Sequence, residues 1–84
     1  MKKMIIISAI WCPSCIIMRD RFESIIKEIK DVEVVSLDFD DDEEEVKEYN
    51  IGNTLPVCIL ADGEKEVRSI GEKSLKELKK IFID

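Results

Sequence analysis

The 84-residue sequence contains no histidine, three cysteines, three glycines and two prolines. Without histidine, the usual Cys/His zinc sites and Cys–His nucleophile pairs cannot be built from this chain alone. Three cysteines are also too few for a disulfide scaffold. Any thiol chemistry must therefore be activated by the fold and the backbone, and we expect no metal and no other cofactor.

The sequence also lacks a long hydrophobic run. The apolar stretch at residues 4–10 is far shorter than the roughly 20 residues that span a bilayer. With Lys2 and Lys3 before it, this stretch resembles a short secretory signal, but Ile10 and Trp11 stand where small residues precede a cleavage site. We therefore expect a cytoplasmic protein with reversible thiol chemistry.

Positive charge is scarce as well. The sequence has 13 Lys and Arg residues and 19 Asp and Glu residues, which gives a net charge of −6. An acidic surface argues against nucleic acid and anionic membrane as partners. A hydrophobic fraction of 45% excludes a disordered chain. At this length we expect residues 1–84 to form one domain, and we expect a monomer.

Two cysteines with C-x-x-C spacing stand where a buried strand is expected to lead into a helix. The apolar residues at 3–10 predict the strand, and apolar residues recurring every three or four positions predict a helix over residues 13–30. Pro13 suits the first helical position. A helix N-terminus offers unpaired N–H groups and a positive dipole end, which stabilise a thiolate, so Cys12 and Cys15 are the candidate reactive residues.

The remaining residues predict three more strands and two more helices. Strands are expected at 32–39, 57–61 and 66–70, with Val67 and Ile70 buried and Arg68 exposed. The acidic run at 40–45 predicts the start of a short helix reaching Tyr49. A calcium loop starting at Asp38 is rejected, because its sixth and twelfth positions lack the required glycine and glutamate.

A last helix is expected after Ser74, which forms a capping box with Glu77. The element order is then β-α-β-α-β-β-α. The opening βαβ unit requires a parallel crossover, and the Asp62-Gly63 turn adds an antiparallel hairpin. The sequence thus predicts an α/β protein with a four-stranded mixed sheet and three flanking helices.

These landmarks together resemble the thioredoxin superfamily, in particular its small thioredoxin- and glutaredoxin-like members. The resemblance rests on the Trp11-to-Cys15 motif after a buried strand, Leu55-Pro56 before the third strand, and Gly71 ahead of the terminal helix. It implies a thioredoxin-like fold and a thiol-disulfide oxidoreductase. Its expected partners are disulfide-containing target proteins and an electron donor of the thioredoxin reductase type.

The resemblance also implies residue roles. Cys12 is expected to be the exposed nucleophile, and Cys15 the more buried resolving thiol. Pro56 is expected to be the cis-proline beside them. The residues expected to contact the substrate are Trp11, Pro13, Ser14, Leu55 and Pro56.

Some features depart from each branch of the superfamily. Trp11 before the first cysteine is similar to thioredoxins, whereas Pro13 after it is similar to glutaredoxins. The paired glycines with which glutaredoxins hold glutathione are absent around Gly71. Ile6 stands where thioredoxins usually carry a buried aspartate that transfers a proton to the second cysteine.

Several alternatives stay open at this point. A glutathione-dependent oxidoreductase, a Cu(I)-binding C-x-x-C module, a shared iron–sulfur cluster and a non-enzymatic interaction domain all fit the motif. Trp11 fits either a core position or a docking surface. Cys58 is expected to be a small buried strand residue rather than a third redox thiol.

Overall fold

The computed structural model describes residues 2–29 and 31–83 and contains four strands and three helices. The strands are β1 (Lys2–Ser8), β2 (Val32–Asp38), β3 (Val57–Asp62) and β4 (Lys65–Ile70). The helices are α1 (Pro13–Glu28), α2 (Glu43–Lys47) and α3 (Leu75–Phe82). The predicted order β-α-β-α-β-β-α is confirmed.

The four strands form one mixed sheet in the order β2-β1-β3-β4. β1 pairs in parallel with β2, as a right-handed βαβ crossover through α1 requires, and antiparallel with β3. β3 and β4 form the antiparallel hairpin around Gly63, whose φ of 66° is accessible to glycine at little cost. The predicted four-stranded mixed sheet is thereby confirmed.

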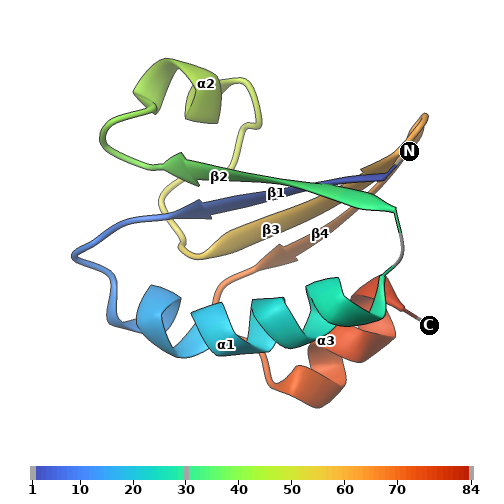
Figure 1. The fold of residues 1–84 in the computed structure, drawn as a ribbon. Helices are drawn as coiled ribbons and strands as arrows, with labels where there is room; N and C mark the ends of the chain where they lie inside the picture. Colours follow the sequence, from blue (N-terminus) through green and yellow to red (C-terminus); the bar gives the residue numbers. More distant parts are fainter. Residues whose placement is uncertain (1, 30, 84) are drawn as a thin grey trace.

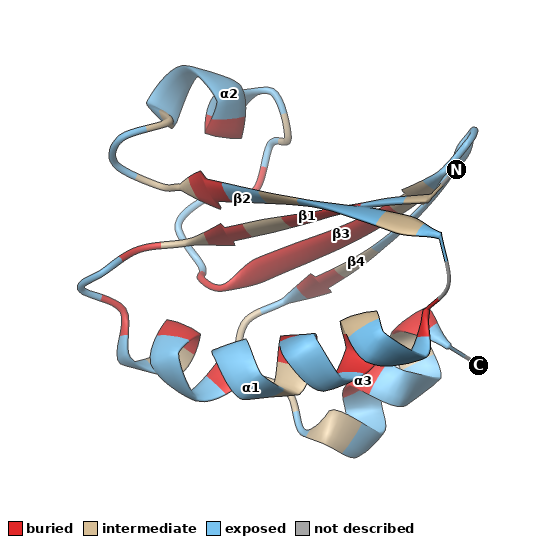
Figure 2. Ribbon diagram, viewed as in Figure 1, coloured by how far each residue is buried: buried red, intermediate tan, exposed pale blue. Residues whose placement is uncertain are grey.

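Helices lie on both faces of this sheet. Figure 1 shows α1 and α3 side by side below the sheet and α2 on its other side, near the end of β2. The buried residues divide into two clusters accordingly. One contains Met18 and Phe22 of α1 and Leu78 of α3, and the other contains Val46 of α2. β3 is buried along most of its length, as Figure 2 shows, because both clusters use it.

Both ends of α1 and the start of α3 follow local sequence signals. Pro13 occupies the first turn of α1, and the helix ends at Glu28 with Ile29 as its C-cap. The predicted end at Lys30 lies outside the described residues. The capping box of α3 is present, with the Glu77 amide donating to Ser74 Oγ over 3.2 Å.

Within residues 2–29 and 31–83, no helix is both long enough and apolar enough to cross a bilayer.

The first strand ends earlier than the apolar run predicts. β1 stops at Ser8, and Ile10 is 91% exposed rather than part of a buried strand. The amide of Cys12 donates to the carbonyl of Ala9 over 3.2 Å, so residues 9–12 make a tight turn. This turn brings Cys12 to the start of α1.

The acidic segment forms a shorter helix than predicted, because α2 ends at Lys47 instead of reaching Tyr49. Its N-cap residue, Asp42, makes no side-chain capping bond and instead accepts from the amide of Asp38 over 2.8 Å. Asp38 in turn accepts from the amides of Asp40 and Asp41. These carboxylates therefore shape the turn between β2 and α2.

The predicted burial of β4 is wrong. Val67 and Ile70 are 39% and 43% exposed, whereas Ser69 is only 2% exposed. Val67 and Ile70 are three residues apart and so point to opposite faces of the sheet, at its edge.

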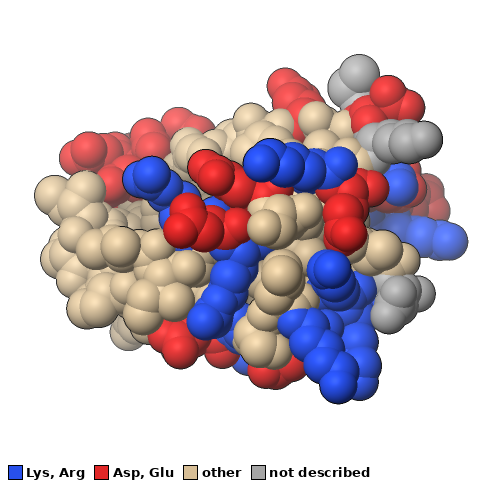
Figure 3. Space-filling view, turned by 60° about the horizontal axis from the view of Figure 1, so that its bottom comes forward, with Lys and Arg blue, Asp and Glu red and all other residues tan. Residues whose placement is uncertain are grey.

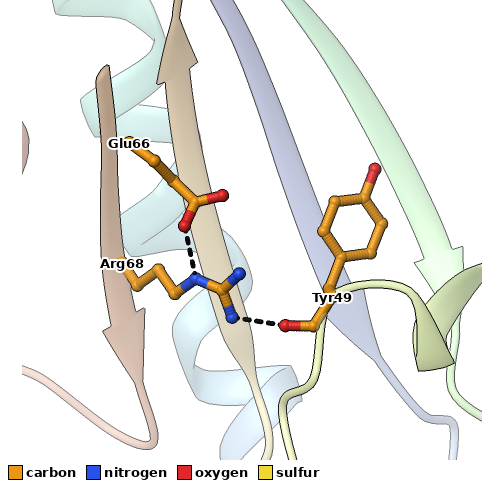
Figure 4. Close-up of polar contacts among 3 residues, drawn as sticks. All are labelled: Tyr49, Glu66 and Arg68. Atoms are coloured by element: carbon orange, nitrogen blue, oxygen red, sulfur yellow. Dashed lines mark hydrogen bonds and ion pairs between the residues drawn. The ribbon is translucent and has the colours of Figure 1, made fainter. Parts of the chain in front are cut away.

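Arg68 of β4 is half-buried rather than exposed. It donates one hydrogen bond to the carbonyl of Tyr49 after α2 and another to Glu66 over 2.8 Å (Figure 4). Arg68 thereby links the segment that follows α2 to β4.

Candidate functional site

The C-x-x-C motif lies at the N-terminus of α1. Cys12 is the N-cap residue, with extended backbone (φ −95°, ψ 109°), and Pro13 follows at the first helical position. The backbone N–H of Cys15 donates a hydrogen bond to the Sγ atom of Cys12 over 3.3 Å. This bond and the positive end of the helix dipole both stabilise negative charge on a sulfur at the N-cap.

Both cysteines of the motif are free thiols, and both are buried. Cys12 is 6% exposed and Cys15 is 9% exposed. The expectation that Cys12 is the more exposed of the two is therefore wrong, because the turn at residues 9–12 folds Cys12 into the cluster that also contains Ala9 and Leu55. The two thiols differ in their electrostatic surroundings instead.

The pKa of the Cys15 thiol is raised to about 11. Burial is the largest cause, because removing the group from water disfavours its charged form. The hydrogen bond with the Cys12 side chain raises it further, and negative charge on Cys12 acts in the same direction. Cys15 is thus a protonated thiol at neutral pH, one helical turn from Cys12.

Leu55 and Pro56 lie beside the cysteine pair. Their peptide bond is cis, as the resemblance implied, and both side chains are buried. The Pro56 carbonyl accepts from the amide of Gly71 over 2.9 Å, which links this segment to the end of β4. Leu55 belongs to the same core cluster as Cys12 and Cys15. The fold therefore brings together residues that lie 40 or more positions apart in sequence.

A cavity of about 330 Å³ lies beside Cys15. Pro56 lines it together with Cys15, as do Ile6, Ser8, Ser36 and other residues of β1, β2 and α1. Its charged lining residues are Arg19 and Glu23, which the sequence analysis did not select. Arg19 and Glu23 follow Cys15 by four and eight residues, so the three side chains lie on neighbouring turns of one face of α1. This spacing is the feature of the sequence from which their place beside Cys15 could have been predicted.

Trp11 lies on the surface beside the motif, which excludes a core position, and its role in docking stays a prediction. Its side chain is 57% exposed. The indole N–H donates to the carboxylate of Asp40 over 2.6 Å, and the ring makes an edge-to-face contact with Phe39 at a centroid distance of 6.2 Å. Of the other predicted contact residues, Pro13 is exposed and Ser14 is half-buried.

Cys58 is separate from the pair. It is fully buried in β3 within the core cluster that contains Met4 and Met18, whereas Cys12 and Cys15 belong to the other cluster. Burial raises the pKa of the Cys58 thiol to about 12. The expectation of a small buried strand residue is confirmed.

Among residues 2–29 and 31–83, no three or more His, Cys, Asp or Glu side chains come together in a group that could hold a metal. The acidic side chains between β2 and α2 instead accept backbone hydrogen bonds, as described above.

A family model described as thioredoxin matches residues 1–84 of the chain. The chain belongs to the thioredoxin family. The predicted resemblance and the thioredoxin-like fold are thereby confirmed. The comparison with curated protein sequences finds no match.

Solved thioredoxin structures agree closely with this thioredoxin-family chain. Mitochondrial thioredoxin 3 from Saccharomyces cerevisiae is 26% identical with a TM-score of 0.81, and the match covers 96% of this chain and 76% of that chain. Thioredoxin from Fasciola hepatica is 28% identical with a TM-score of 0.77, covering 95% and 77% of the two chains. Trxlp from Edwardsiella tarda, at 23% identity, shares the fold with a TM-score of 0.86 over 99% and 82%.

Proposed function

We propose that this protein is a thiol-disulfide oxidoreductase that reduces disulfides in target proteins through Cys12 and Cys15. The observation that carries the proposal is the hydrogen bond from the Cys15 amide to Cys12 Sγ at the N-terminus of α1. A thiolate, rather than a thiol, is the nucleophile in disulfide exchange, and this position stabilises a thiolate. Membership of the thioredoxin family supports the same chemistry.

The reaction has two exchange steps. The Cys12 thiolate attacks one sulfur of the target disulfide, which breaks that bond, forms a mixed disulfide and releases the first target thiolate. Cys15 then gives up its proton and attacks Cys12 Sγ. A Cys12–Cys15 disulfide forms, and the second target thiolate leaves. The target gains two electrons from the protein. Its two thiolates take up two protons, one released earlier when Cys12 ionised and one released by Cys15.

The surface around Cys12 is proposed to receive the target. Trp11, Pro13 and Ser14 form the accessible border of the motif, and Leu55 and Pro56 present their backbone beside it. An electron donor of the thioredoxin reductase type then returns the Cys12–Cys15 disulfide to the dithiol. A monomer acting in the cytoplasm stays part of this proposal.

The proposal is tested by following reduction of a disulfide-bonded model protein, with dithiothreitol recycling the enzyme. Wild type is expected to accelerate reduction, and Cys12→Ser to be inactive. Cys58→Ser is the matched control, because Cys58 lies in the other core cluster, and it should retain activity. Equal rates for wild type and Cys12→Ser would refute the proposal. Replacing dithiothreitol by glutathione tests the glutathione-dependent alternative, which predicts full turnover with that reductant.

A further inference from the structure

Several large apolar side chains surround the cysteine pair on the surface. Ile10, Trp11, Ile16 and Ile17 are 91%, 57%, 71% and 50% exposed, and we call them the apolar patch. They flank Cys12 on both sides, in the turn before α1 and in its first turns. Figure 3 shows an extensive uncharged area at the end of the molecule where, in Figure 1, the loop between β1 and α1 lies.

The apolar patch is joined to a groove on its α2 side. The Trp11 indole bonds Asp40 and contacts Phe39, and both of these residues also line a groove of about 550 Å³. Val46 and Ile51 contribute further apolar lining to the groove. A polypeptide lying across the patch can therefore continue past Trp11 and Phe39 into the groove.

The charges beside this surface are predominantly negative. Asp40 and Glu43 line the groove. Among its described lining residues the one cation is Lys47, which is paired with Glu43 over 3.4 Å. Just outside the groove, Asp41, Glu44 and Glu45 are exposed. Lys and Arg gather most densely toward the opposite end of the molecule in Figure 3. A segment entering the groove therefore meets net negative charge close to Cys12.

We propose that the targets are polypeptides whose disulfide is flanked by apolar residues and, a few residues away, by Lys or Arg. The apolar residues cover the apolar patch, and the basic side chain reaches the acidic border of the groove. Complementary charge raises the association rate and disfavours acidic segments at the same place. This inference rests on the proposed oxidoreductase function and adds its substrate class.

The test compares two disulfide-linked peptides that differ only in carrying Lys or Glu three residues from the cysteine. At low ionic strength, kcat/KM is expected to be about tenfold higher for the Lys peptide, and the ratio should fall toward one as salt is added. Equal rates, or a preference for the Glu peptide, would overturn this inference and leave the oxidoreductase function standing. Reduction of neither peptide would overturn the oxidoreductase function itself.

A charge-neutralised variant locates the effect. Replacing Asp41, Glu44 and Glu45 by their amides removes three charges beside the groove, and none of these side chains has a hydrogen bond or ion pair among the described residues. The Lys-over-Glu ratio should fall several-fold in this variant. An unchanged ratio would contradict the proposed placement of the basic side chain.

A matched control removes the same number of charges at the far end of the sheet. Glu33, Asp62 and Glu64 are exposed and lie at or near the positions paired with the first residues of β1, away from Cys12. Their amide variant should keep the wild-type ratio. An equal fall in both variants would show that net charge, rather than the groove, sets the preference, and would overturn the inference.

Discussion

The backbone N–H of Cys15 donates to the Sγ atom of Cys12, with 3.3 Å between nitrogen and sulfur. The Cys15 side chain favours its protonated form, because burial and the neighbouring Cys12 raise the pKa of its thiol to about 11. Cys15 thus stabilises negative charge on Cys12 through its backbone N–H, while the Cys15 side chain keeps its own proton. This asymmetry supports the proposed order of the two exchange steps.

The resolving step should be strongly pH-dependent. Burial, the largest cause of the raised pKa of Cys15, persists when Cys12 is in the mixed disulfide. Cys15 therefore stays mostly protonated at pH 7, and its thiolate fraction grows about tenfold per pH unit below its pKa. The rate of the second step is therefore expected to rise steeply between pH 7 and 9. An aromatic disulfide that releases a coloured thiolate at each step measures both phases by stopped flow.

The control for this experiment is Cys15→Ser, which should show the first phase only. If the second phase of the wild-type protein were independent of pH over this interval, deprotonation of Cys15 would not limit the resolving step.

Asp40 should hold the Trp11 ring in place. Asp40→Ala removes the 2.6 Å bond to the indole, so the ring is left with its contact to Phe39 and gains freedom of motion. Because Trp11 is the single tryptophan of the chain, the steady-state fluorescence anisotropy should fall. Asp41→Ala is the matched control, since its carboxylate makes no bond to Trp11. Identical anisotropy in both variants would argue against the bond in solution.

Arg68 should stabilise the end of α2. Arg68→Ala leaves the Tyr49 carbonyl without its donor, and we expect a loss of about 1–2 kcal/mol in the free energy of unfolding by urea. Glu66→Gln removes only the partly exposed ion pair, for which about 0.5 kcal/mol is expected. Faster amide exchange at residues 46–50 in the first variant would locate the effect. Equal losses in the two variants would contradict the role given to the Tyr49 carbonyl.

The capping box should contribute measurably to α3. Ser74→Ala removes the acceptor for the Glu77 amide and is expected to cost about 1 kcal/mol in urea unfolding. Ser24→Ala, in the exposed middle of α1, should cost little and serves as the control. A loss no greater than that of Ser24→Ala would refute the capping role.

Glu77 adds a pH dependence to this element. Its bonds to Ser74 lower the pKa of the Glu77 carboxyl in the folded state. The stabilisation is therefore present above the pKa of the unfolded chain and is lost as the pH falls through the lower, folded value. The difference between wild type and Ser74→Ala should shrink correspondingly in acid, and a difference that grew would contradict this assignment.

The fold and the position of the cysteine pair at the start of α1 could be predicted because their signals are local. Pro13 and the period of three to four residues after it determine α1, and Ser74 with Glu77 determines the start of α3. The C-x-x-C spacing itself places Cys12 and Cys15 on one turn. Such features depend on residues within a few positions of one another, which a single sequence displays directly.

The errors came from features that depend on tertiary packing. Ile10 belongs to an apolar run but lies in a turn, and Ile70 lies at a sheet edge, so neither is buried. The burial of Cys12 depends on neighbours such as Leu55, far away in sequence. The cavity beside Cys15 is likewise lined by residues of different elements, such as Glu23 of α1 and Ser36 of β2. Hydrophobicity alone does not report which apolar residues the finished fold covers.

The most direct test of the assigned order is mass spectrometry of the protein after brief exposure to a disulfide-linked target peptide. Cys15→Ser should accumulate a mixed disulfide between the peptide and Cys12, because the resolving thiol is missing. Cys12→Ser should accumulate little adduct, since burial, the largest cause of the raised pKa of Cys15, still favours its protonated form. An adduct on Cys15 forming as fast as the adduct on Cys12, or no adduct in either variant, would contradict the account.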